Sequence, residues 1–222
     1  MLSQSIEDYL KIIYKLQNGG ASATKVTTSL IAERMEVTAA SATNMIKKLA
    51  EMNLLEYTPY RGVALKTAGE KIALETIRHH RLIELYLSEA LGYPWDEVDA
   101  EAERLEHAIS EEFEERIDKM LGYPTIGAHG EPIPNKDGHI EEHTYPRLAD
   151  IDLGQRAVIR RVSDRNPAML RYMNDMGLQL GTEIEVREKA PFRGPITLVI
   201  EANNPQSLGL EVAEHIFVDL LK

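Results

Sequence analysis

The chain has 222 residues, of which 43% are hydrophobic and 27% charged, a composition typical of folded proteins and unlike collagen or disordered chains. No apolar run approaches the ~18–20 residues that a membrane helix needs, and the acidic Glu7 and Asp8 do not fit a signal peptide. There is no cysteine, which excludes disulfides, thiol catalysis and thiolate metal sites. Together these features predict a cytoplasmic protein.

The net charge of −11 is distributed unevenly. Residues 1–73 carry nine basic and seven acidic side chains, residues 74–145 carry six and eighteen, and residues 146–222 carry ten and eleven. The middle segment also contains six of the seven histidines. Carboxylates and imidazoles gathered in one segment suggest a site for a divalent cation, although an acidic helix face that is simply exposed to water has the same composition.

Residues 1–73 predict a winged helix-turn-helix DNA-binding domain. The spacing of apolar residues indicates three helices, at residues 4–17, 30–35 and 39–52. Two short strands follow, at residues 54–57 and 63–66, and they flank a predicted hairpin turn at 58–62. Three helices followed by a hairpin are the element order of a winged helix.

Residues 74–145 predict a helical metal-binding and dimerisation domain that ends in a linker. Two long amphipathic helices are expected, at residues 68–91 and 96–121. Their apolar faces exceed what one small bundle must bury, which suggests that the chain is a homodimer. Residues 124–150 are rich in proline, glycine and asparagine and predict an irregular linker that is compatible with an ordered structure.

Residues 146–222 predict a small SH3-like (FeoA-like) β-barrel. The apolar periodicity indicates strands at residues 157–162, 183–186, 195–200 and 216–218 and one short helix at 167–176. The expected fold class is therefore mainly α with small β parts, with an N-terminal winged helix-turn-helix, a helical dimerisation domain and a C-terminal SH3-like β-barrel.

Candidate metal ligands are concentrated on three of the predicted helices. Glu103, Glu106 and His107 have the spacing that places side chains on one face of a helix. His80 and Glu84 share a face of the preceding helix, and Asp8 lies on the first helix. Such oxygen and imidazole ligands suit one or two divalent cations. The alternative is that the helix bearing Glu103 is a solvated acidic helix.

The third predicted helix has the composition of a DNA recognition helix. Small and polar side chains fill its first turns and can approach base edges in the major groove: Thr38, Ala40, Ser41, Thr43 and Asn44. Basic side chains on the same helix and on the wing can contact phosphates: Lys47, Lys48 and Arg61. The alternative is an ordinary solvated helix of an interaction module.

Four stretches of the chain, at residues 7–10, 60–63, 78–84 and 101–107, together with the C-terminal SH3-like domain, resemble the diphtheria toxin repressor family. The resemblance extends over nearly the whole chain. It implies a metal-activated, dimeric transcriptional repressor that binds operator DNA and controls genes of metal-ion homeostasis.

The ligand types resemble the manganese-responsive branch of that family. Iron-responsive members have methionine on the first helix and cysteine on the fifth, where this chain has Asp8 and Glu103. Carboxylates make the site harder and favour Mn²⁺, with Fe²⁺, Zn²⁺ and Co²⁺ as alternatives. The chain departs from the shorter manganese regulators at Lys11, where they carry a glutamate, and this departure bears on whether the site holds two ions.

The resemblance also implies a second metal site. Longer manganese regulators use a histidine in the linker and an aspartate before the short helix of the barrel, and His129 and Asp164 match these positions. With His80 and Glu84 they would form a second site for Zn²⁺ or Mn²⁺. The alternative role of Asp164 is to cap the helix that follows it.

Three functions are compatible with these features. The first is a metal-activated repressor, responding to Mn²⁺ or alternatively to iron. The second is a metallohydrolase that uses the Glu/His cluster, but the sequence offers no separate catalytic acid or base. The third is a metal-independent winged-helix adaptor that binds protein. The DNA-binding module favours the first, and we therefore expect a regulator without enzyme activity.

Overall fold

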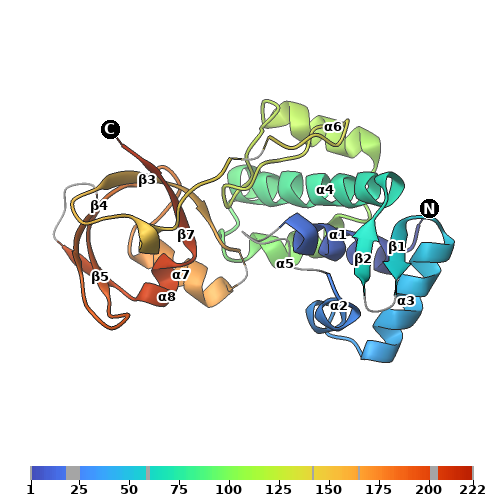
Figure 1. Ribbon diagram of the computed structural model, residues 1–222. Coiled ribbons are helices and arrows are strands. Elements are labelled where there is room, and N and C mark those ends of the chain that lie inside the picture. The colour runs from blue at the N-terminus through green and yellow to red at the C-terminus, as the bar shows by residue number, and fades with distance from the viewer. Residues whose placement is uncertain are drawn as a thin grey trace. The chain divides into compact units, whose positions relative to one another are not determined.

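The computed structural model describes residues 2–18, 26–58, 61–141, 143–164, 166–200 and 205–221 (Figure 1). The chain forms two compact units. The first unit comprises Met1–His80, Glu103–Arg116 and Pro134–Ile140, and the second comprises Arg81–Ala102, Ile117–Ile133 and Glu141–Lys222. The division into three domains expected from the sequence remains a prediction, since the helices of the middle segment contribute to both units. No helix among the described residues is long and apolar enough to cross a bilayer.

The first unit contains the winged helix-turn-helix that the sequence predicts. Its elements are α1 (Gln4–Asn18), α2 (Thr28–Arg34), α3 (Ala39–Glu51), β1 (Leu55–Thr58) and β2 (Gly62–Leu65). The two strands pair antiparallel, with Leu55 opposite Leu65. Residues 59 and 60 of the expected turn lie outside the described residues. Fully buried aliphatic side chains from all three helices form one core: Leu10, Ile13, Ile31, Ile46 and Leu49.

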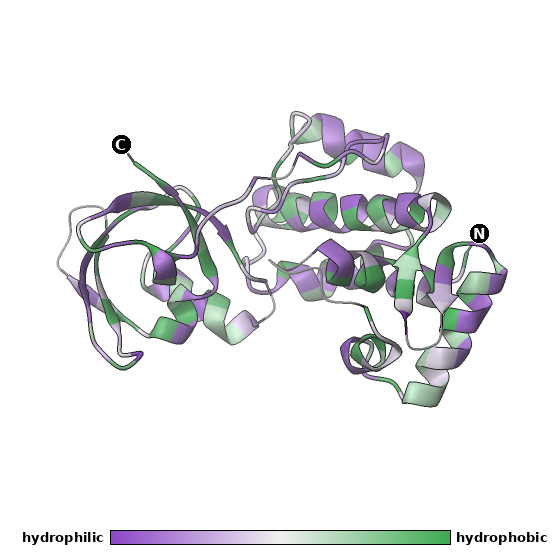
Figure 2. Ribbon diagram, viewed as in Figure 1, coloured by the Kyte–Doolittle hydropathy of each residue, from purple (hydrophilic) through white to green (hydrophobic). Residues whose placement is uncertain are grey.

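The middle segment differs from the sequence prediction at one point that matters for the site. The helix α4 (Thr67–Leu91) is continuous, but the single helix expected at 96–121 is two helices, α5 (Val98–Leu105) and α6 (Glu111–Met120). A turn at residues 106–108 separates them. The Ser110 hydroxyl then accepts a hydrogen bond from the Phe113 amide at 3.2 Å and caps the new helix. The acidic first turn of α6 suits a helix N-terminus, and this helix is largely hydrophilic (Figure 2).

The second unit contains the SH3-like domain, as predicted. A short 3-10 turn, η1 (Leu148–Asp150), leads into β3 (Arg156–Val162), α7 (Pro167–Asp175), β4 (Glu183–Lys189), β5 (Ile196–Ile200), β6 (Gln206–Leu208), α8 (Leu210–Ala213) and β7 (Ile216–Leu220). The strands form one antiparallel sheet in the order β6-β5-β4-β3-β7, which curves around its core (Figure 1). The sequence did not predict β6 and α8, because three or four residues are too few to produce a readable period.

The linker is irregular, as expected; its residues up to Ile133 and from Glu141 onward belong to the second unit, and Pro134–Ile140 belong to the first. The carbonyl of His129 accepts a hydrogen bond from the Val162 amide at 2.9 Å. Gly130, with φ of +89°, follows directly, and a Cβ at this position would lie 2.1 Å from the Arg160 carbonyl oxygen. Only glycine therefore lets the linker approach β3 so closely and hold His129 there.

Candidate metal centre

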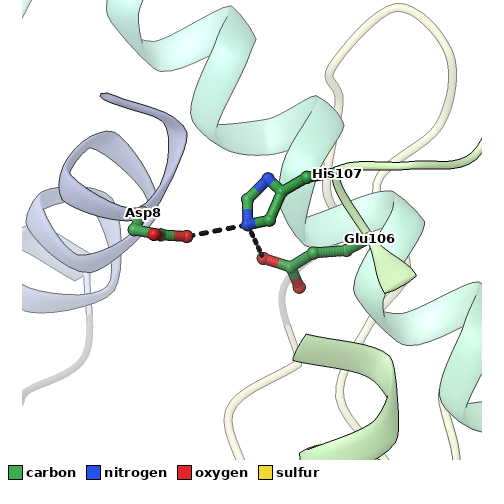
Figure 3. Close-up of side chains that lie close together, drawn as sticks. All are labelled: Asp8, Glu106 and His107. Atoms are coloured by element: carbon green, nitrogen blue, oxygen red, sulfur yellow. Dashed lines mark ion pairs between the residues drawn. The ribbon is translucent and has the colours of Figure 1, made fainter. Parts of the chain in front are cut away.

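The first cluster of potential ligands joins α1 to the turn after α5 (Figure 3). Asp8 lies on α1, whereas Glu106 and His107 lie in the turn. The His107 Nε2 lies 2.8 Å from Asp8 Oδ1 and 3.3 Å from Glu106 Oε1, so the three side chains point toward one another (Figure 3). One potential ligand atom from each lies within 4.8 Å of those of the other two. The expectation that Glu103, Glu106 and His107 share one helix is wrong, but the turn still brings Glu106 and His107 to Asp8.

Glu7 fixes the orientation of His107, a role that the sequence did not reveal. The His107 Nδ1 donates a hydrogen bond to Glu7 Oε2 at 2.6 Å. This bond keeps the Nδ1 proton in place, so Nε2 is the nitrogen that faces the two carboxylates. Glu7 was part of the motif at 7–10, but adjacent residues on a helix point about 100° apart. Glu7 and Asp8 therefore contact the same histidine only because His107 lies between their side chains.

A second group of side chains adjoins the first and contains a lysine. Potential ligand atoms of His80, Glu103 and Glu106 lie within 4.8 Å of one another. The Lys11 Nζ donates hydrogen bonds to Glu103 Oε2 at 2.6 Å and to both oxygens of Glu106 at 2.7 and 2.8 Å. The His80 Nδ1 donates to Glu106 Oε2 at 2.5 Å. Glu106 is thus common to both groups.

The electrostatics of these groups favour the binding of a cation. Burial raises the pKa of the Asp8 carboxyl, and the charge of His107 only partly offsets this effect. Burial alone would lower the pKa of Lys11, but the charges of Glu106 and Glu103 raise it above its ordinary value. Ionised, the carboxylates of Glu7, Asp8, Glu103 and Glu106 carry four negative charges, which the ammonium of Lys11 and the neighbouring His80 and His107 offset only in part. A divalent cation therefore fits the donor set and the charge of this cluster.

A separate cluster lies in the second unit and contains three of the predicted second-site residues. His129 is fully buried, and its Nε2 donates a hydrogen bond to the Trp95 carbonyl at 2.8 Å. Its Nδ1 lies 3.4 Å from Glu84 Oε1. Burial alone would lower the pKa of His129, but the interaction with Glu84 raises it to about 9. The histidine therefore carries the positive charge next to this carboxylate.

Glu131 belongs to the same cluster and was not predicted. Burial raises the pKa of its carboxyl, and the nearby charge of Asp164 raises it further. Asp164 does not cap the short helix that follows. The side chain of Asn166 does so, accepting hydrogen bonds from the amides of Ala168 and Met169. The linker has no period that would have placed Glu131 beside Asp164, so the sequence carried no signal for it.

The predicted DNA-contacting residues lie on α3 and on the wing. The Thr38 hydroxyl accepts a hydrogen bond from the Ser41 amide at 3.2 Å, and that of Thr43 donates to the Ala39 carbonyl at 2.7 Å, so both stabilise the helix itself. The remaining predicted residues have exposed side chains: Ala40, Ser41, Asn44, Lys47, Lys48 and Arg61. Ser41, Asn44 and Lys48 line one shallow groove beside the helix.

Family models match three successive segments of the chain. Residues 1–63 match the iron-dependent repressor N-terminal DNA-binding domain, and residues 66–135 match the iron-dependent repressor metal-binding and dimerisation domain. Residues 147–220 match the FeoA domain.

Similar proteins carry related names. The iron-dependent repressor IdeR of Mycobacterium leprae is 29% identical over 98% of each chain, and the diphtheria toxin repressor of Corynebacterium jeikeium is 30% identical over 75% of this chain and 70% of its own. Among solved structures, a manganese-dependent transcriptional repressor in complex with manganese is 39% identical, with a TM-score of 0.90 over 97% of this chain and 100% of its own. The manganese regulator SloR is 34% identical, with a TM-score of 0.75 over 97% and 98%. These matches confirm the resemblance seen in the motifs: the chain belongs to the diphtheria toxin repressor family of metal-dependent, DNA-binding transcriptional repressors.

Proposed function

We propose that this repressor is activated by Mn²⁺ and binds operator DNA as a homodimer. The observation that carries the proposal is the donor set of the first cluster, in which Asp8, Glu106 and His107 offer carboxylate oxygens and one imidazole. Hard oxygen ligands favour Mn²⁺ over softer, thiophilic ions, and the chain has no cysteine to supply a thiolate. The similar structures named as manganese-dependent support this assignment, whereas the relatives named as iron-dependent make Fe²⁺ the alternative.

Asp8, Glu106 and His107 would hold the ion, and Glu7 orients His107 for this role. When bound, the cation supplies positive charge that offsets the carboxylates of the cluster. Asp8 and Glu7 extend from α1, so their interactions with His107 hold α1 against the turn after α5. Because α1 and α3 share one core through Leu10, Ile13 and Ile46, fixing α1 also restrains the recognition helix. Two subunits restrained in this way can present their α3 helices to successive turns of one DNA face.

We also propose that the cluster in the second unit, called the second cluster from here on, is an auxiliary metal site. Its ligands would be Glu84, His129 and Asp164, with Glu131 as a further oxygen ligand. His80, which the sequence grouped with this site, remains a predicted ligand, and its Nδ1 donates a hydrogen bond to Glu106. The hydrogen bond from His129 Nε2 to the Trp95 carbonyl directs Nδ1 toward Glu84, as metal-binding histidines require.

On DNA, Ser41 and Asn44 would contact base edges, and Ala40 would allow close approach of the helix. Lys47, Lys48 and Arg61 would contact phosphates, which gives affinity without sequence preference. Because operator DNA is the expected partner, we expect the protein to act in the cytoplasm.

A gel shift with operator DNA and a metal titration tests the proposal. We expect tight binding with Mn²⁺, weaker activation by Zn²⁺, and none after chelation with EDTA. Asp8→Ala should abolish activation, whereas Glu89→Ala, which removes an exposed acid from α4, should not. Stronger activation by Fe²⁺ than by Mn²⁺ would assign the protein to the iron-responsive alternative, and tight binding in EDTA would reject metal gating.

The same assay tests the interface. Asn44→Ala should cost about 1–3 kcal/mol on the preferred operator and relax its sequence preference, whereas Lys47→Ala should weaken all sequences alike and lower the salt slope by about one. An unchanged ranking of operator variants with Asn44→Ala would contradict the base-reading role.

A further inference from the structure

Lys11 lies in a buried environment, where proteins usually have apolar side chains or paired charges. It extends from α1, and only 3% of its surface is exposed. Lysine is almost never fully buried unless its charge is paired. Here its ammonium is paired twice, with the half-exposed Glu103 and with both oxygens of the fully buried Glu106. The ammonium has three N–H donors, enough for these three hydrogen bonds.

The position of this ammonium coincides with a group of potential metal ligands. His80, Glu103 and Glu106 are one of the sets of side chains whose ligand atoms are close enough to hold an ion. The Lys11 Nζ lies within hydrogen-bonding distance of both glutamates and 3.5 Å from His80 Nδ1. An ion bound by the same three side chains would have to occupy the same space as the ammonium, and two cations repel each other strongly at such a separation.

We propose that the Lys11 ammonium permanently takes the place of a second cation in this cluster, so that the cluster accepts one metal ion per subunit, at Asp8, Glu106 and His107. The inference rests on the proposed function in one respect only, namely that these three residues receive an ion.

A second consequence concerns the protein without metal. Lys11 is covalently part of α1, and Glu103 and Glu106 belong to α5 and to the turn after it. Their ion pairs therefore tie the winged helix to this turn whether or not a metal is present. They also hold Glu106 so that its Oε1 lies 2.7 Å from Lys11 Nζ and 3.3 Å from His107 Nε2. A carboxylate fixed in this way is preorganised for its role as a metal ligand.

Two substitutions and a control separate the consequences. Lys11→Glu replaces the ammonium by a further carboxylate ligand, and Lys11→Met removes the charge but keeps an unbranched chain. Lys15→Met is the matched control, because Lys15 lies one turn further along α1 and is exposed.

The first measurement is the stoichiometry of Mn²⁺ binding to the full-length protein, by isothermal titration calorimetry and by electron paramagnetic resonance. Any ion at the auxiliary site is common to all variants, so only the difference from the wild type is interpreted. We expect Lys11→Glu to bind one more ion per subunit than the wild type, and Lys15→Met to bind the same number. Equal stoichiometry for Lys11→Glu and the wild type would overturn the proposal.

The second measurement uses metal-free protein and remains informative if Lys11→Glu fails to fold. In EDTA, hydrogen exchange of the α1 amides and of residues 103–107 should be at least about tenfold faster in Lys11→Met than in the wild type, because the buried Glu106 loses its partner. Lys15→Met should exchange like the wild type. Unchanged exchange in Lys11→Met would overturn the proposal. Because no metal is present, failure of Mn²⁺ activation in the gel shift would leave this result standing, and the two failures are distinguishable.

Discussion

The two clusters contain the same kinds of side chain, yet they compensate their carboxylates in different ways. In the first unit, the ammonium of Lys11 is held between Glu103 and Glu106. In the second unit, the protein supplies the charge through His129, whose pKa of about 9 reflects the carboxylate of Glu84. A lysine with a raised pKa keeps its proton at neutral pH, whereas a histidine can exchange its proton for a metal ion. The ammonium of Lys11 is therefore always present in the first cluster. In the second cluster, a metal ion can replace the proton of His129.

The same comparison distinguishes two carboxylates within the first cluster. Glu106 is bonded to Lys11 and His80, and although burial alone would raise the pKa of Glu106, these partners lower it below its ordinary value. Asp8 has only partial compensation, and its pKa is raised. Glu106 thus stabilises the metal-free fold, whereas Asp8 destabilises it slightly and gains most from a bound cation. Stability and metal affinity should accordingly respond to different residues.

The largest effect is expected for Glu106→Ala in metal-free protein. It leaves the Lys11 ammonium buried without its main partner, which should lower the free energy of unfolding by about 3–5 kcal/mol. Glu103→Ala is the control, because Glu103 contacts the same ammonium but its side chain is 50% exposed, and it should cost no more than about 1 kcal/mol. Urea denaturation followed by circular dichroism measures both. Equal losses for the two variants would show that burial does not set the strength of this pairing.

Asp8→Asn should affect metal binding without a loss of stability. Neutralising a carboxylate whose ionised form is disfavoured leaves the metal-free protein as stable as the wild type or slightly more so. The affinity for Mn²⁺, measured by calorimetry, should fall by at least about 100-fold, because even the loss of a residue that only orients a ligand costs about 10–100-fold. Glu7→Gln, which perturbs only the orientation of His107, should have the smaller effect. The reverse order would assign the ligand role to Glu7.

Glu114 pairs with basic side chains in a part of the first unit for which we propose no metal site. The buried Arg78 and the neighbouring His79 lower the pKa of the Glu114 carboxyl to about 2. Because the folded-state pKa lies below the unfolded one, this pairing stabilises the protein fully above about pH 4.5 and progressively less as the pH falls toward 2. Between pH 4.5 and pH 3 the loss should be on the order of 1 kcal/mol, since solvent screening weakens a partly exposed pair.

Denaturation curves at several pH values measure this contribution. Glu114→Gln should flatten the pH dependence below pH 4.5, since the variant has no carboxyl to protonate. Glu112→Gln removes an exposed pair with Arg116 on the same helix and should retain the wild-type slope. An unchanged slope in Glu114→Gln would mean that other groups dominate acid denaturation.

The smallest effect is expected in the second cluster. Asp164→Asn should raise the Mn²⁺ concentration for half-maximal operator binding by about tenfold or less, because Asp8, Glu106 and His107 remain intact. It should also speed proteolysis of the linker in the presence of Mn²⁺, since the cluster then holds His129 less tightly. Asp175→Asn, at an exposed position of α7, is the control and should behave like the wild type. Unchanged cleavage in Asp164→Asn would argue against an auxiliary metal site.

Much of the fold was predictable because its signals are local. Apolar spacing and a short hairpin predicted the winged helix, and the apolar periodicity along β3, β4, β5 and β7 predicted the barrel. The same local reasoning failed at residues 106–108, where the helical period of the sequence continues through a turn. Ser110 caps the start of α6. A serine within a continuous helical spacing of apolar residues, however, does not by itself predict that one helix ends and another begins.

The sequence by itself determined which ligand types are present and which helices carry most of them: Asp8 on the first helix, His80 and Glu84 on the fourth, and the acidic motif beyond. Only the tertiary structure decided how these residues are grouped. Lys11 meets Glu106 across 95 residues, His107 meets Glu7 across 100, and Glu131 shares the surroundings of Asp164 although it lies in the linker. Periodicity and capping report on neighbours within a few turns, whereas contacts between distant segments depend on how whole elements pack. For that reason the sequence marked Lys11 as a departure from a pattern, and only the fold places its charge within hydrogen-bonding distance of two carboxylates.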